Sequence, residues 1–152
     1  MNRNVFLLIF SIMLMTACQK KSMDEFDMVN KWQTTYLKVE MPTANKSDSL
    51  KVVEDRFDHN PERIAQSQYF MDGTFSAWFL TKEGKQVDRT TGKWSMKKDS
   101  LIVDFIYGWK TVTVGYKIIP IENGFKGISK YDWDNDGEYD DLLTMETKMI
   151  KN

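Results

Sequence analysis

GKWSMKKDSLIVDFIY, residues 92–107, decides the fold class of this chain. Its first half alternates apolar and polar residues, and its second half places Leu101, Val103 and Phe105 on one face. Apolar side chains at every second position are typical of a strand with one buried face, and the polar residues 98–100 are typical of a tight turn. The stretch therefore predicts an antiparallel hairpin with an apolar inner face.

Similar runs lie on both sides of this hairpin, at residues 31–41, 68–81, 110–118, 125–131 and 142–150. Short turns such as Asp72-Gly73 separate them, and no long crossover intervenes. We therefore expect an all-β fold over residues 30–152, a single antiparallel up-and-down barrel of about eight strands. An open β-sandwich is the alternative. One or two short helical turns are expected near residues 49–66. Residues 50–57, LKVVEDRF, fit either a helical turn or a short strand, and Asn60 followed by Pro61 is typical of a helix start.

The alternating strands predict an inward-facing set of side chains: Trp94, Met96, Leu101, Val103, Phe105, Val112, Val114 and Tyr116. Two interpretations of this set stay open. These side chains fill the core, or they line a pocket for a small hydrophobic ligand, since eight strands enclose a space of that size. Trp109 and Trp133 fall in turns and are candidates for contacts at the rim of the barrel.

The first 18 residues, MNRNVFLLIFSIMLMTAC, have the pattern of a secretory signal. Arg3 precedes an apolar stretch from Val5 to Met15, which is too short to span a membrane as a helix. Small residues before the lone Cys18 resemble the lipobox of bacterial lipoproteins. An ordinary signal peptide cut near Ala17 is the alternative.

The lipobox resemblance implies that residues 1–17 are a signal peptide and that residues 18–29 form a lipid-anchored tether. It also implies that the Cys18 thiol carries diacylglycerol with acyl chains such as palmitate, so that the membrane is a partner through this anchor. Gln19, where an aspartate would favour the inner membrane, implies the outer membrane of a Gram-negative cell envelope. The side of the membrane stays open.

Three further stretches carry a second resemblance: KWQTTY from residue 31, DGTFSAWF from residue 72 and GKWSMKKDSLIV from residue 92. Together with the lipobox they resemble the lipocalin-like lipoproteins of bacterial envelopes, over roughly residues 30–150. The resemblance implies an antiparallel barrel and a small apolar ligand. It supplies no set of catalytic residues.

Residues 130–141, KYDWDNDGEYDD, carry six acids in their last ten positions. The spacing places Asp132, Asp134, Asp136, Glu138 and Asp140 as oxygen ligands in one register of a calcium loop, and either Asp140 or Asp141 could close the shell. Leu143 stands where an EF-hand has a bidentate glutamate, so this is not an EF-hand. Two interpretations remain, a loop that binds Ca²⁺ and a structural turn between the last two strands.

Composition narrows the function classes. The formal net charge of −1 argues against general nucleic-acid binding, which needs a basic surface. His59 is the only histidine, so a triad or a zinc site would depend on it alone. We therefore expect a non-catalytic protein: a binding module for a hydrophobic ligand or, alternatively, a structural or protein-interaction lipoprotein that functions through its loops.

Overall fold

The computed structural model describes residues 23, 26–47, 49–59, 61–107 and 109–151. This part of the chain contains nine strands and the short 3-10 turn η2. The elements are β1 (Lys31–Met41), η2 (Ala44–Lys46), β2 (Lys51–Asp55), β3 (Arg63–Tyr69), β4 (Thr74–Thr81), β5 (Gln86–Lys97), β6 (Ser100–Tyr107), β7 (Lys110–Ile121), β8 (Gly124–Tyr131) and β9 (Asp141–Met149). Among these residues, no helix has the length and apolar character needed to cross a membrane.

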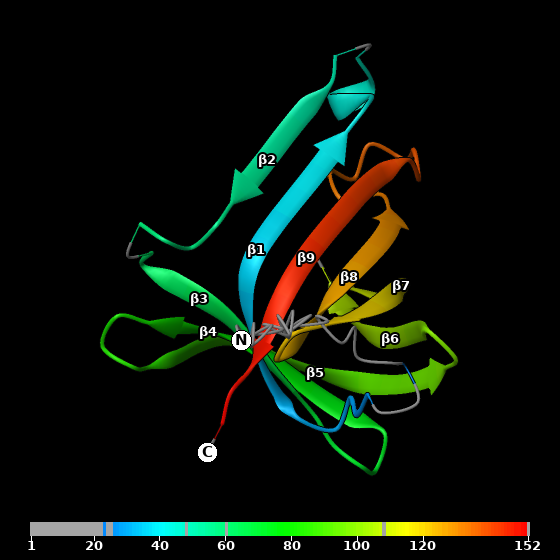
Figure 1. Ribbon diagram of the computed structural model, residues 1–152. Helices are drawn as coiled ribbons and strands as arrows, with labels where there is room; N and C mark the ends of the chain where they lie inside the picture. The colour runs from blue at the N-terminus through cyan, green and yellow to red at the C-terminus, as the bar shows by residue number, and fades with distance from the viewer. Residues whose placement is uncertain (1–22, 24–25, 48, 60, 108, 152) are drawn as a thin grey trace, which may run out of the picture.

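Eight of the strands form a closed antiparallel barrel (Figure 1). From β3 to β9 each strand pairs with the next along the chain, and β1 lies between β3 and β9. The β1–β9 pairing closes the barrel and runs from Trp32 opposite Met149 to Glu40 opposite Leu142. The prediction of an eight-stranded antiparallel barrel is confirmed, and β2 is an additional strand outside the closed ring.

One edge of β1 is shared by two strands. β3 pairs with its beginning, Lys31–Gln33, and β2 pairs with its end, Leu37–Met41. Between β2 and β3, the described residues 56–59 and 61–62 do not pair with β1. Figure 1 shows the result, with β2 beside the far half of β1 and away from the remaining strands.

The helical turns expected near residues 49–66 are wrong. Residues 51–55 and 63–69 are strands, and the helical turn of this region lies earlier, at Ala44–Lys46. Asn60, the predicted N-cap, lies outside the described residues. Local capping signals are weak compared with strand pairing, and β3 pairs with β4 along its whole length, from Arg63 opposite Thr81 to Tyr69 opposite Phe75.

A single apolar core lies between the strands. Its buried members are Met28, Trp32, Tyr69, Phe75, Leu101, Val103, Val112, Val114, Ile118 and Phe125. Met28 precedes β1, and the others come from β1, β3, β4, β6, β7 and β8, where alternate residues of each strand point to the same side of the sheet. Leu101 at 0% exposure marks the centre of this core.

The two ends of the barrel are built differently. At the end where β1 begins, called here the N-terminal end, the segment before the first strand packs onto the core. Met28 is buried there, Phe26 stacks on Trp32 with 5.8 Å between ring centroids, and the Trp32 Nε1–H donates to the Met28 carbonyl at 3.1 Å. The sequence placed residues 26–29 in the tether, yet Phe26 and Met28 pack against the barrel.

At the opposite end, called here the distal end, lie η2, the β4–β5 and β6–β7 turns and the acidic loop between β8 and β9. The acidic loop therefore lies at the opposite end from residues 26–30 and from the end of β9. Because antiparallel strands alternate in direction, this assignment follows from the strand order alone.

Candidate functional site

The predicted inward set lies along three neighbouring strands. Trp94 on β5 pairs with Val103 on β6, which pairs with Val114 on β7, so these residues share one face of the sheet. The structure places all eight predicted side chains in the core or packed against it: Trp94, Met96, Leu101, Val103, Phe105, Val112, Val114 and Tyr116. Their shared position inside the barrel follows from the strict alternation seen in the sequence.

These eight side chains divide into two classes of burial. Leu101, Val103, Val112 and Val114 are buried, whereas Trp94, Met96, Phe105 and Tyr116 are half-buried. On β6 and β7, Phe105 and Tyr116 are therefore less buried than the valines and leucine that share their face of the sheet.

Tyr116 is half-buried by its exposed fraction, yet its phenol is buried enough for burial to shift its pKa. Burial raises the pKa of its phenol well above the ordinary value, and the neighbouring Tyr69 phenol raises it further. Burial also raises the pKa of Tyr69, opposed in part by a hydrogen bond with Ser67. The two phenols thus influence each other inside the barrel, and both are neutral donors and acceptors at physiological pH.

Ser129 on β8 lies in the same row of the sheet. It pairs with Tyr116 on one side and with Leu143 on the other, and it is 2% exposed. Within the described part of the protein, its Oγ has no hydrogen-bond partner. A buried hydroxyl without a partner costs on the order of 1–3 kcal/mol, so such groups mark places where a ligand or a water molecule completes the structure.

Aromatic rings line the space beside this row. Tyr69 stacks on Phe75 and meets Trp94 edge-on, each with 5.6 Å between ring centroids, and Phe75 meets Phe105 edge-on at 6.2 Å. The Trp94 Nε1–H donates to the Phe70 carbonyl at 3.0 Å, which fixes the indole. These rings therefore form an apolar wall of flat side chains, in which the hydrogen bond of Trp94 fixes its indole.

Sequence reasoning missed Tyr69, Phe75 and Ser129. Tyr69 and Phe75 lie symmetrically about Asp72 and face each other across the hairpin, whereas a two-residue Asp72-Gly73 turn would have placed Phe70 opposite Phe75. Ser129 alternates with Gly127 along β8, and small residues at inward positions leave room inside a barrel. An added Cβ at Gly127 would lie 2.8 Å from the end of the Met145 side chain, which would have to shift.

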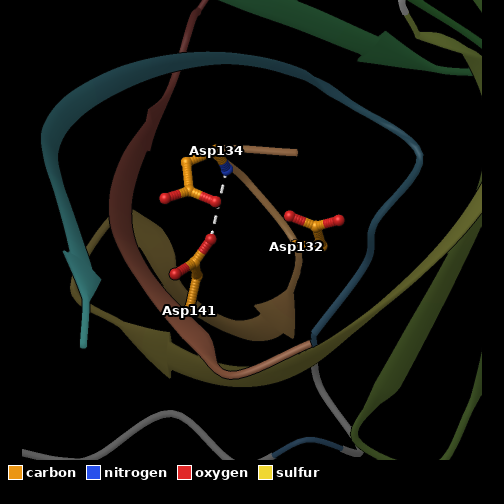
Figure 2. Close-up of side chains that lie close together, drawn as sticks. All are labelled: Asp132, Asp134 and Asp141. Atoms are coloured by element: carbon orange, nitrogen blue, oxygen red, sulfur yellow. Dashed lines mark hydrogen bonds between the residues drawn. The ribbon is translucent and has the colours of Figure 1, made fainter. Parts of the chain in front are cut away.

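The acidic loop brings together Asp132, Asp134 and Asp141, with one carboxylate oxygen from each within 4.8 Å of the others (Figure 2). Asp141 is the first residue of β9 and is buried. Its Oδ2 accepts hydrogen bonds from the Trp133 amide at 2.6 Å and the Asp134 amide at 3.2 Å. Burial nevertheless dominates and raises the pKa of this carboxyl.

The other predicted ligands point elsewhere. The Asp136 carboxylate accepts from the amides of Glu138 at 2.8 Å and Lys46 at 3.2 Å, so it joins the loop to η2. Asp140 accepts from the Thr43 hydroxyl at 3.3 Å. Glu138 is exposed on the loop surface. The predicted set Asp132, Asp134, Asp136, Glu138 and Asp140 is therefore split, and Asp141 stands beside the first two.

Amide donors already occupy part of this acidic cluster. The two Asp132 oxygens accept from the amides of Asp136 at 3.0 Å and Gly137 at 3.1 Å. Gly137, with a φ of 96°, and Asn135, with a φ of 61°, allow the tight turn that these bonds require. Calcium prefers six to eight oxygens, so three carboxylates would supply only part of a shell.

Trp109 and Trp133 differ in their surroundings. Trp133 packs against the core and lies 5.1 Å from Tyr131 between ring centroids. Trp109 is 99% exposed at the distal end, with a φ of 71°. Of these two predicted rim residues, Trp109 is therefore the one presented to solvent.

No protein-family model matches the chain, and no curated protein matches it. Among solved structures, a lipocalin-like protein from Bacteroides uniformis is 16% identical, with a TM-score of 0.45 over 82% of this chain and 100% of that one. A double mutant of the vaccine antigen transferrin binding protein B from Haemophilus parasuis is 13% identical, with a TM-score of 0.48. That match covers 88% of this chain and 28% of the antigen. Neither likeness assigns a function to this chain.

Proposed function

We propose that this protein is a non-catalytic, lipid-anchored binding module of the bacterial envelope. Its ligand is a small, largely hydrophobic molecule with one polar group, held inside the barrel. The observation that carries the proposal is the row containing Tyr116 and Ser129. There, the half-buried Tyr116 lies opposite Ser129, whose buried hydroxyl has no hydrogen-bond partner among the described residues.

The chemistry of this wall indicates the ligand class. Planar aromatic side chains, Tyr69, Phe75, Trp94 and Phe105, favour an apolar or flat body through dispersion and area burial. The Ser129 hydroxyl and the neutral Tyr116 phenol supply one or two hydrogen bonds to a single polar group. A charged ligand is disfavoured, because the described interior residues offer it no counter-ion.

The anchor completes the proposal. Acylation at Cys18 would tie the chain to the outer membrane of a Gram-negative cell, eight residues before Phe26. Eight residues span at most about 28 Å. The N-terminal end of the barrel would then lie close to the bilayer, with the distal end facing away from it.

Native mass spectrometry tests the ligand. The protein would be extracted from its own host membranes in two different mild detergents, and the expected result is a bound species whose mass is the same in both. Ser129→Ala is expected to lower its occupancy about tenfold, which corresponds to one lost hydrogen bond. Ser95→Ala, on an exposed position of β5, is the matched control and should change nothing. A bound mass that follows the detergent, or equal occupancy in Ser129→Ala, would overturn the proposal.

Anchoring has its own test. Cys18→Ala should release the protein from the membrane fraction and abolish incorporation of labelled palmitate, while the wild type retains both properties. If Cys18→Ala no longer incorporates palmitate but stays in the membrane fraction, this result would contradict anchoring by acylation alone.

A protein partner at the distal end is the second candidate function. It is favoured by Trp109, a large apolar side chain that is 99% exposed at that end, since exposed tryptophans are enriched in binding hot spots. Photo-crosslinking from position 109 in intact cells would recover a discrete protein adduct if this function holds. Crosslinks to lipid or to no protein would count against it.

A further inference from the structure

β2 is an open edge. Each barrel strand has a neighbour on both sides, whereas β2 pairs only with β1 in the part of the chain that the structure describes. The unpaired side of a strand presents amide and carbonyl groups that template the addition of another strand. Figure 1 shows β2 at the margin of the molecule, beside β1.

β2 exposes both apolar side chains, which are typical of an interface, and charged side chains, which are typical of a surface. Val52 and Val53 are 46% and 45% exposed, and Lys51 and Glu54 are also exposed. Two adjacent exposed valines are costly on an edge that has no function, because β-branched residues favour strand pairing. The flanking charges then determine which partner strand fits.

The charges of β2 are self-complementary in one arrangement. The sequence Lys51-Val52-Val53-Glu54-Asp55 has a base at its first position and an acid at its last. In an antiparallel pair centred on Val53, Lys51 of each copy lies opposite Asp55 of the other. A parallel pair would instead place Lys51 opposite Lys51 and Asp55 opposite Asp55, which is repulsive.

We propose that β2 is the dimerisation strand of this protein and pairs antiparallel with β2 of a second copy, about a two-fold axis through Val53. The pairing would join β9, β1 and β2 of each copy into a continuous six-stranded sheet. A two-fold contact of this kind is closed, so it gives dimers and not filaments. It does not depend on the proposed ligand.

Asp55 is held in position for this contact. Its Oδ1 accepts a hydrogen bond from the Phe57 amide at 2.7 Å, which fixes the carboxylate at the end of the strand. Glu54 instead pairs with Arg56 of the same chain at 3.0 Å, on the other face of the strand. Asp55, the acid that the two-fold arrangement uses, has no arginine partner among the described ion pairs, and its Oδ1 lies 3.8 Å from the Nδ1 of His59.

Disulfide trapping in intact cells distinguishes this arrangement. Val53→Cys places the two thiols opposite each other across the axis, within the Cα separation of about 4.4–6.8 Å that a disulfide needs. Val52→Cys is the matched control, because the valine is equally exposed but its symmetry mate lies roughly 8 Å away, beyond that range. We expect a disulfide dimer from Val53→Cys and almost none from Val52→Cys. Cys18 is present in both variants and in the unsubstituted protein, which gives the baseline.

Charge reversal is the second test of the proposed dimer. In the Val53→Cys background, Lys51→Asp should lower the dimer yield about tenfold, because two opposite-charge pairs become repulsive by symmetry. Adding Asp55→Lys should restore it. Equal trapping of both cysteine variants, trapping of a different protein at position 53, or no rescue by the double reversal would each overturn the proposal.

Discussion

The two ends of the barrel are closed by different forces. At the N-terminal end, Phe26, Met28 and Trp32 bury apolar surface, and the bond from Trp32 to the Met28 carbonyl satisfies the one buried donor of the indole. At the distal end, aspartates accept amide hydrogens within the loop and from η2. Apolar burial is insensitive to pH and ions, whereas carboxylates respond to both. Solution conditions should therefore act on the distal end and leave the N-terminal end unchanged.

The largest expected effect on stability comes from removing the Trp32 side chain at the N-terminal end. Trp32→Ala deletes an almost fully buried indole and should lower the free energy of unfolding by about 3–5 kcal/mol. Trp109→Ala, at the exposed distal turn, should change it by less than about 0.5 kcal/mol. Urea denaturation followed by circular dichroism measures both. Equal losses would mean that burial does not distinguish the two ends.

A backbone contact at the same end gives the next effect. A Cβ at Gly124 would lie 1.8 Å from the Thr147 carbonyl oxygen, so Gly124→Ala must push β8 away from β9 and should cost more than about 2 kcal/mol. Gly115→Ala is the control, because an added Cβ there meets nothing within 4 Å. The midpoint of urea unfolding for each variant tests the difference, and a neutral Gly124→Ala would contradict the close strand contact.

Calcium probes the distal end alone. If the Asp132, Asp134 and Asp141 cluster takes Ca²⁺, a concentration a hundredfold above Kd should raise the free energy of unfolding by about 2.7 kcal/mol. Asp134→Asn should remove most of this gain, whereas Asp88→Asn on β5 should keep it. Thermal melts with calcium and with chelator provide the measurement. Identical melts in the unsubstituted protein would leave the loop as a hydrogen-bonded turn.

The smallest effect is the pH response of Asp141. Because burial raises its pKa in the folded protein above the unfolded value, the folded state binds a proton more tightly. Lowering the pH through the folded pKa towards the unfolded one should therefore stabilise the protein relative to Asp141→Asn. Stability of the two proteins compared between pH 7 and pH 4 checks the sign. A relative loss on acidification would mean that hydrogen bonding to the carboxylate outweighs its burial.

Much of the barrel could be predicted, because alternation is a local property. Residues 92–107 form the expected hairpin, and all eight predicted inward side chains face the core. The acidic stretch lies in the expected loop between the last two strands. These features depend on neighbours in sequence and on strand period, which a single chain reveals.

The rest depended on contacts between distant segments. β2 is a strand because β1 extends beyond β3 and offers it an edge, a condition absent from residues 49–66 themselves. Asp141 replaces Asp140 in the cluster because β9 begins at residue 141 and turns that side chain inward. Ser129 becomes a candidate ligand contact only because Tyr116 lies opposite it. Register across strands decides all three, and sequence period alone does not fix it.

The β1–β9 pairing has a consequence for the order of folding. It joins residues 32–40 to residues 142–149, so the ring cannot close until the end of the chain is available. Neighbouring hairpins form early because their loops are short, whereas this pairing carries the largest loop-closure entropy in the molecule. If the chain is exported from its N-terminus, the barrel can therefore close only after the last strand has emerged.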